Sequence, residues 1–299
     1  MHDSSFKEGP SVYRAITDKI IAAIEAGAGE FAMPWHFCQA TTRPVNAATG
    51  AKYRGVNVVG LWAEAMLSKY ETGYWASYRQ WQAIGGQVRR GEHGATIVFY
   101  REIEPSGDAP DASDEEQPDR RFVARASHVF NAEQVEGWSP PVQVTVSEWE
   151  ACQRAEAFIA ATSAEIAHGG EHAYYDIRHD RICLPHRERF VGTPTSSAAE
   201  SFYSTALHEL VHWSGAAHRL ARTYGRFGTA EYAFEELIAE LGAAFLCGHL
   251  GVSNEPRPDH AAYVGHWLQH LRKDSRAILH AAGMAEKAVT WLTELAAEN

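Results

Sequence analysis

Two histidines and a glutamate follow the pattern H-E-x-x-H at positions 208–212. Residues four apart in a helix share a face, so His208 and His212 can each direct one imidazole nitrogen toward the same metal ion. Glu209 lies beside that point, where its carboxylate can take a proton from a water molecule on the metal. The pattern predicts a hydrolytic site with one divalent metal ion, for which Zn²⁺ is the first candidate. The simpler alternative is a surface helix with two solvated histidines.

A hydrolytic zinc site also needs a third protein ligand and one open position for water. His218 is one candidate, because residues 208–218 read H-E-x-x-H-x-x-G-x-x-H, the spacing of metzincin peptidases. Glu236 is the favoured candidate. It lies on the next predicted helix, with Glu240 four residues further along the same face. One of these carboxylates can bind the metal while the other orients a ligand histidine. A solvated acidic stripe is the alternative interpretation of that helix.

The predicted motif helix, about residues 197–214, follows a group of short β segments. The segments at 165–168, 173–177 and 181–184 predict a small antiparallel sheet. Further helices are predicted at 148–161, 229–250, 258–272 and 274–296. The C-terminal half is therefore expected to be mostly helical with one small sheet.

The N-terminal half mixes the two kinds of element. Apolar spacing predicts helices at 11–27, 56–69 and 75–84, and β-branched and aromatic residues predict strands at 95–102 and 121–130. Residues 102–119 hold eight acidic and no basic residues, so 103–120 is predicted to be a disordered loop of a β-hairpin. Turn residues cluster at 137–141. We expect an α+β protein of two domains, 1–137 and 138–299.

Aromatic and basic residues interleave between positions 52 and 90. Single-stranded nucleic acid is bound by stacking of its bases on aromatic rings and by cations along its phosphates. Three of the aromatic residues, spaced i, i+3 and i+6, fit a buried stripe at least as well. The candidate DNA-binding residues are Lys52, Tyr53, Arg54, Trp75, Tyr78, Trp81, Arg89 and Arg90.

Composition limits the class of protein. The net charge of −11 argues against a wholly basic nucleic-acid binder, although residues 1–101 carry eleven Lys and Arg against eight Asp and Glu. No apolar run reaches the roughly 20 residues of a membrane span, and the N-terminus lacks a signal-peptide pattern. The four cysteines include no C-x-x-C pair. These features predict a cytoplasmic protein.

Longer motifs carry a family resemblance over nearly the whole chain. They are Asn46–Gly50, Tyr53–Asn57 and Gly85–Glu92 in the N-terminal half, and His208–Trp213 and Tyr232–Gly242 in the C-terminal half. With these motifs the sequence resembles the ArdC family of antirestriction proteins of conjugative plasmids. The first half is similar to that family's single-stranded-DNA-binding domain, shared with plasmid TraC-type primases. The second half is similar to its zincin-like metallopeptidase domain.

The resemblance implies a protein that binds incoming single-stranded DNA during conjugation and protects it from host restriction. It implies a peptidase-type centre whose host protein substrate is unidentified, and it favours Glu236 over His218 as the third ligand. The alternative is a non-enzymatic shield of single-stranded DNA with a structural or vestigial metal site. A nuclease fits less well, because nucleases usually use two metal ions held by several carboxylates.

Overall fold

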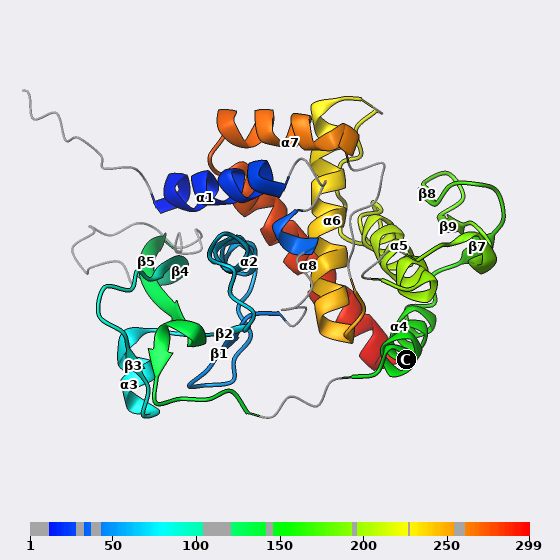
Figure 1. Cartoon of the computed structure of the whole chain (residues 1–299). Helices are drawn as coiled ribbons and strands as arrows, with labels where there is room; N and C mark the ends of the chain where they lie inside the picture. The colour runs from blue at the N-terminus through cyan, green and yellow to red at the C-terminus, as the bar shows by residue number, and fades with distance from the viewer. Residues whose placement is uncertain are drawn as a thin grey trace, which may run out of the picture.

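The computed structural model describes residues 12–27, 33–36, 43–103, 121–141, 146–192, 196–226, 228–253 and 261–299. Two long helices, α6 (Ala230–Leu250) and α8 (Ala277–Glu298), pack together at its centre. Figure 1 shows α1 (Val12–Gly27) and α2 (Val56–Ser68) on one side of this pair. It shows α4 (Glu148–Ala161) and α5 (Ala198–Ser214) on the other, and α7 (Ala261–Lys273) along the top. These elements agree with the predicted helices, and the fold is α+β as expected.

The two helices that carry the candidate ligands begin at side-chain caps. Ser197 and Glu200 form a capping box at the start of α5, in which the Ser197 hydroxyl accepts from the Glu200 N–H at 3.1 Å. Thr229 caps α6 by accepting from the Tyr232 N–H at 3.2 Å. Such caps satisfy N–H groups that have no partner within the helix. Almost every residue of α5 from Phe202 onward is buried, so the motif helix lies in the core and the surface-helix alternative is excluded.

Helices α5 and α6 approach each other closely because α6 has a glycine at their contact. A Cβ atom on Gly242 would lie 2.8 Å from both γ-carbons of Val211. Real Cβ atoms do not come this close, so only glycine fits here. On α5 this contact lies within one turn of His208 and His212, and on α6 it lies between one and two turns beyond Glu236, so it holds the two backbones together beside the candidate ligands.

One apolar cluster runs through both halves of the sequence, from Ile16 in α1 to Leu292 in α8. Trp62 in α2 packs on Phe245 in α6, with ring centroids 5.7 Å apart. A partly buried ion pair between Arg43 and Glu286 adds a polar link between the halves. The N-terminal helices therefore share a core with the metal-motif helices, and the division at residue 137 stays a prediction.

The N-terminal sheet has the strand order β1-β2-β5-β4. The predicted hairpin is confirmed: β4 (Ala95–Ile103) pairs antiparallel with β5 (Arg121–Asn131), with Ala95 opposite Val129. The acidic loop predicted between them lies outside the described residues. Next to β5 lies β2 (Tyr74–Ala76), which is parallel to β1 (Val45–Asn46). A separate pair joins β3 (Gln87–Val88) to β6 (Val135–Glu136).

The single helix predicted at 75–84 is wrong at its start. Trp75 belongs to strand β2, where it pairs with Asn131, and the helix α3 spans only Tyr78–Ala83. Ser77 ends the strand because its side chain caps α3 in a capping box with Gln80. The local cap and the sheet pairing together outweigh the helical spacing of the aromatic residues.

The small C-terminal sheet is mixed, not antiparallel as predicted. Its strands are β7 (Ile166–His168), β8 (Tyr174–Asp176) and β9 (Arg181–Leu184), in the order β7-β9-β8. The chain reverses direction twice, so β9 runs antiparallel to β8 but parallel to β7. Among the described residues, no helix has both the length and the apolar character to span a bilayer.

We predict that Gly242→Ala destabilises the fold whereas Gly283→Ala, in α8, does not. Both changes gain about 1 kcal/mol of helix propensity. At Gly242 the new methyl group overpacks against Val211 at a cost of about 1–3 kcal/mol, and rotation of that side chain cannot help because both of its γ-carbons are close. At Gly283 nothing lies within 4 Å. Urea unfolding measures both, and equal midpoints for the two variants would contradict the close helix contact.

Candidate metal centre

Two histidines from α5 and one glutamate from α6 converge in the core. The Nε2 atoms of His208 and His212 lie 3.1 Å apart. Glu236 directs one carboxylate oxygen to each, at 3.6 Å from His208 Nε2 and 3.5 Å from His212 Nε2. The three side chains offer ligand atoms that all lie within 4.8 Å of one another, and all three residues are buried. The structure therefore brings together the pair predicted from the motif and the favoured third ligand.

The second nitrogen of each histidine faces another glutamate of α6. His212 Nδ1 lies 3.1 Å from Glu235 Oε1, and His208 Nδ1 lies 3.2 Å from Glu240 Oε1. In the tautomer that binds a cation, the proton of each imidazole is on Nδ1, on the side of its carboxylate, and the lone pair is on Nε2. Two lone pairs and the Glu236 carboxylate then point at one place. This arrangement attracts a cation, and two imidazoles plus one carboxylate match the three-ligand set of catalytic zinc sites.

The formal charge of the surroundings also suits a divalent cation. Glu235, Glu236 and Glu240 are buried carboxylates, and Arg222 is a buried guanidinium beside them. Glu209 on α5 is a fourth buried carboxylate, so with neutral imidazoles these groups carry a net charge of −3. Buried charges are costly unless they are paired, so a cation of charge +2 at this point would offset most of that charge.

The pKa values follow the same electrostatics. Burial acts to lower the pKa of His212, but hydrogen bonds to Glu235 and Glu236 outweigh it and raise this pKa to about 10. Burial acts to raise the pKa of Glu236, yet the two imidazoles hold it well below its usual range. The pKa of Glu235 is lowered in the same way by His212 and Arg222. The site thus favours positive charge between its carboxylates.

Arg222 orients Glu235, the carboxylate that contacts His212 Nδ1. Its guanidinium donates to both oxygens of Glu235, at 2.9 and 3.0 Å, and to the Val211 carbonyl at 2.6 Å. A Cβ atom on Gly215 would lie 2.7 Å from the Arg222 guanidinium. The glycine after the motif therefore makes room for the arginine that orients Glu235.

The alternative third ligand, His218, lies away from this cluster. Its side chain is 63% exposed, and its Nε2 lies 3.2 Å from Asp180. The neighbouring Arg219 also pairs with Asp180 and lies over the Trp213 ring at 3.8 Å. These contacts hold the segment after Gly215 against the small sheet and direct His218 toward it. The metzincin spacing is therefore present in the sequence without the corresponding geometry.

The predicted DNA-binding residues fall into three groups by exposure. Trp75 and Trp81 are 1% and 0% exposed and belong to the core, as the alternative of a buried stripe implies. They cannot present a ring face to a base. Tyr53 is partly buried, and its hydroxyl donates to the Trp75 carbonyl at 3.3 Å. The exposed residues of the predicted set are Lys52, Arg54, Tyr78, Arg89 and Arg90.

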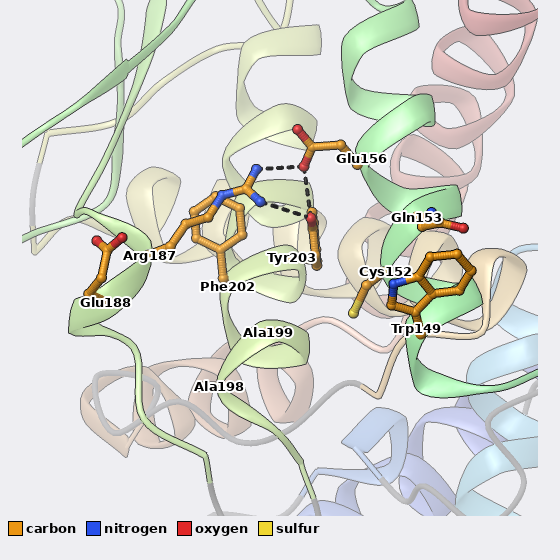
Figure 2. A pocket seen from close by; sticks show the side chains of 10 residues that line it. All are labelled: Trp149, Cys152, Gln153, Glu156, Arg187, Glu188, Ala198, Ala199, Phe202 and Tyr203. Atoms are coloured by element: carbon orange, nitrogen blue, oxygen red, sulfur yellow. Dashed lines mark hydrogen bonds and ion pairs between the residues drawn. The ribbon is translucent and has the colours of Figure 1, made fainter.

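A pocket of about 600 Å³ lies beside the first two turns of α5. Figure 2 shows Arg187, Glu156 and Tyr203 pointing toward one another within it. Arg187 donates to Glu156 at 2.6 Å and to the Tyr203 hydroxyl at 3.2 Å, and Tyr203 donates to Glu156 at 2.8 Å. None of the candidate ligands lines this pocket. The triad joins α4, the turn Arg187–Arg189 and α5, and so anchors the start of the motif helix.

Two residues at the centre escape sequence reasoning. Arg222 contacts Glu235 from 13 positions away, and His36 contacts Glu240 from 204 positions away. Neither stands at a helical spacing from the histidine motif. The one sequence feature beside either residue is the Pro34-Trp35 pair before His36. That pair lies in the N-terminal half, so the sequence does not link it to the histidine motif.

Comparisons with known proteins agree with this architecture. Residues 10–130 match the N-terminal domain of the anti-restriction factor ArdC, and residues 153–284 match a zincin-like metallopeptidase family. Protein y4eC of Sinorhizobium fredii (strain NBRC 101917 / NGR234) is 45% identical over 287 residues, which cover 94% of this chain and 91% of that protein. DNA primase TraC of Escherichia coli is 35% identical over 92% of this chain, which spans only 26% of the primase.

Two solved structures have a similar fold. The metal-free crystal structure of the antirestriction protein ArdC from plasmid R388 gives a TM-score of 0.75 at 37% identity, over 96% of this chain and 98% of that one. Its Mn(II)-bound structure gives 0.73 at 36% identity, over 95% and 98%. A protein of this fold therefore binds a divalent metal ion.

We predict that Glu236→Gln weakens metal binding far more than His218→Ala does. The first change removes a carboxylate that faces both imidazoles, and the second removes an exposed side chain. Loss of a residue that only supports a ligand typically costs 10–100-fold in metal affinity, and we expect Glu236→Gln to exceed about 100-fold. Calorimetric titration of the apo protein with Zn²⁺ and Mn²⁺ measures both. A larger loss in the His218 variant would overturn the assignment of Glu236.

Proposed function

The chain belongs to the ArdC family of antirestriction proteins, and from this premise we propose that it protects incoming single-stranded DNA from restriction and carries a metal-dependent peptidase-type centre. The observation that carries the second part is the convergence of His208, His212 and Glu236 between two buried helices. The zincin-like family match of residues 153–284 supports it. The match of residues 10–130 supports a DNA-binding role for the N-terminal half.

In this proposal His208, His212 and Glu236 hold one divalent cation, and Zn²⁺ is our candidate for it. When bound, such a cation supplies Lewis-acid chemistry and lowers the pKa of a coordinated water. Glu209 is 4% exposed and directly follows His208 on α5. Its carboxylate is the general base that accepts a proton and returns it to the leaving amine. Glu235 and Glu240 keep the imidazoles oriented throughout. The substrate would be a host protein.

The proposed DNA surface lies around α3 and β3, far along the chain from the metal ligands. Tyr78 is 42% exposed, and its hydroxyl accepts from Gln87 Nε2 at 3.1 Å. Arg90 is exposed three residues beyond Gln87. Exposed rings for base stacking and exposed cations for phosphate contacts are the two features that bind single strands. In this proposal the protein acts in the cytoplasm, where the incoming strand would meet it.

We predict that Tyr78→Ala weakens binding of a single-stranded oligonucleotide by about 1–3 kcal/mol, the usual contribution of one stacked base. Tyr174→Ala is the matched control, because Tyr174 is a similarly exposed tyrosine (51%) in the small C-terminal sheet. Fluorescence anisotropy at several salt concentrations measures both. The Arg90→Ala variant should reduce the log–log salt slope by about 0.7, the value for one phosphate contact on a single strand. Equal affinity for single and double strands would argue against the proposal.

We predict that Glu209→Ala retains metal affinity but abolishes the peptidase-type activity, because a lost general base typically costs about 10²–10⁴-fold in rate. The readout is protection of transferred plasmid DNA in a restricting recipient, relative to a non-restricting one. Glu171→Ala, at an exposed position, is the control. Protection that persists in Glu209→Ala but is lost in the Arg89→Ala, Arg90→Ala double variant would favour the non-enzymatic shield instead.

A further inference from the structure

His36 lies in the N-terminal half of the sequence but is buried against the metal-ligand helix α6. It ends the short 3₁₀ helix η2 (Pro34–His36), and its side chain is 1% exposed. Its Nε2 lies 3.3 Å from Glu240 Oε2, across 204 positions of sequence. The other oxygen of Glu240 faces His208 Nδ1 at 3.2 Å. One carboxylate therefore connects His36 to a candidate metal ligand.

The hydrogen bonds of His36 define its tautomer. The backbone N–H of Met33 donates to His36 Nδ1 at 3.2 Å, so that nitrogen carries a lone pair. The ring proton is then on Nε2 and is donated to Glu240. Glu240 accepts from His36 with one oxygen and faces His208 with the other. With its proton on Nδ1, which faces Glu240 Oε1 at 3.2 Å, His208 directs its Nε2 lone pair at the metal centre.

The two ligand histidines thus have parallel supports. Behind His212 stand Glu235 and then Arg222. Behind His208 stand Glu240 and then His36. In each support a buried carboxylate lies between the imidazole and a second donor, which stops the carboxylate from rotating. The difference is that the last member on the His208 side comes from the N-terminal half.

The segment that carries His36 is held firmly in the core. Met33 is 0% exposed and Trp35 is 4% exposed. The Trp35 ring packs on Trp267 of α7, with centroids 6.1 Å apart. Because Met33 and Trp35, which precede it, are packed in the core, His36 presents its Nε2 to Glu240 from a well-defined backbone position.

We propose that His36 is a positioning residue of the metal centre, through which the N-terminal half completes the site in the C-terminal half. The inference rests on the proposed metal site. His36 does not touch the metal in this scheme. It restrains Glu240, which in turn holds the His208 ring in the orientation and tautomer that bind a cation. Metal affinity and docking of the Met33–His36 segment on α6 are therefore thermodynamically linked.

The test is titration of full-length apo protein with Co²⁺, followed by calorimetry and by visible absorption of the bound ion. His36→Asn keeps an amide oxygen near the position of Nδ1, which can still accept from Met33, but it does not reach Glu240. His36→Gln extends an amide N–H toward the position of Nε2 and keeps that donor. We expect His36→Asn to weaken Co²⁺ binding by about 10–100-fold, the usual effect of losing an outer hydrogen-bond partner. His36→Gln should recover most of the affinity and the wild-type absorption spectrum.

Met33→Ala is the control for packing alone. It leaves a cavity in the same segment while keeping the backbone N–H and His36, so it should lower thermal stability but reduce Co²⁺ affinity far less than His36→Asn does. If His36→Asn does not fold, His36→Leu replaces it in the comparison with His36→Gln.

The outcomes separate the inference from the proposed function. Wild-type protein that binds no Co²⁺, Zn²⁺ or Mn²⁺ would overturn the metal centre itself. Wild-type protein that binds metal, with unchanged affinity in folded His36→Asn, would overturn the positioning role alone. Equal losses in the Asn, Gln and Met33→Ala variants would also overturn it, because they would show a packing effect with no dependence on the donor to Glu240.

Discussion

The structure depends on one electrostatic requirement: several ionisable groups are buried together and must be paired. Glu235, Glu236 and Glu240 enter the core on α6 opposite two imidazoles of α5. Each carboxylate would be costly there without a partner. The outer two have donors behind them, Arg222 for one and His36 for the other. Glu236 faces only the two Nε2 atoms among the contacts that define the cluster, and it is the group whose charge a divalent cation would best offset.

Close packing of the helices holds the paired side chains at the distances that these interactions require. The α5 and α6 backbones come close enough for their side chains to meet because Gly242 faces Val211. At one end of α5 the contacts of Arg187, Glu156 and Tyr203 fix the helix to α4 (Figure 2). At the other end Gly215 leaves space for Arg222. Metal sites need their ligands held within narrow limits, and here rigid buried helices hold them, not loops.

The two segments that match different families share one hydrophobic core in this protein. The segments that match the ArdC N-terminal domain and the zincin-like peptidase are distinct in sequence, but Trp62 and Phe245 pack across them. The proposed DNA surface around Tyr78 is on α3, at the outer edge of the N-terminal part and away from α6 and α8 (Figure 1). The TraC primases contain a region similar to nearly all of this chain within a much longer protein, so the two segments recur as one unit.

The sequence by itself determined the local features. The spacing of His208 and His212 follows from the helix period, and the cap at Ser197 and the β4–β5 hairpin follow from short-range patterns. Only the tertiary structure decided which distant groups meet. It brought Glu236 to the two histidines and left His218 away from them, because the contacts of Arg219 turn that segment toward the small sheet. Helical spacing alone allowed Trp75 and Trp81 to be either buried or exposed, and the tertiary structure places both in the core. It also brought His36 to Glu240 across 204 positions, a contact that no periodicity encodes because long-range packing alone creates it.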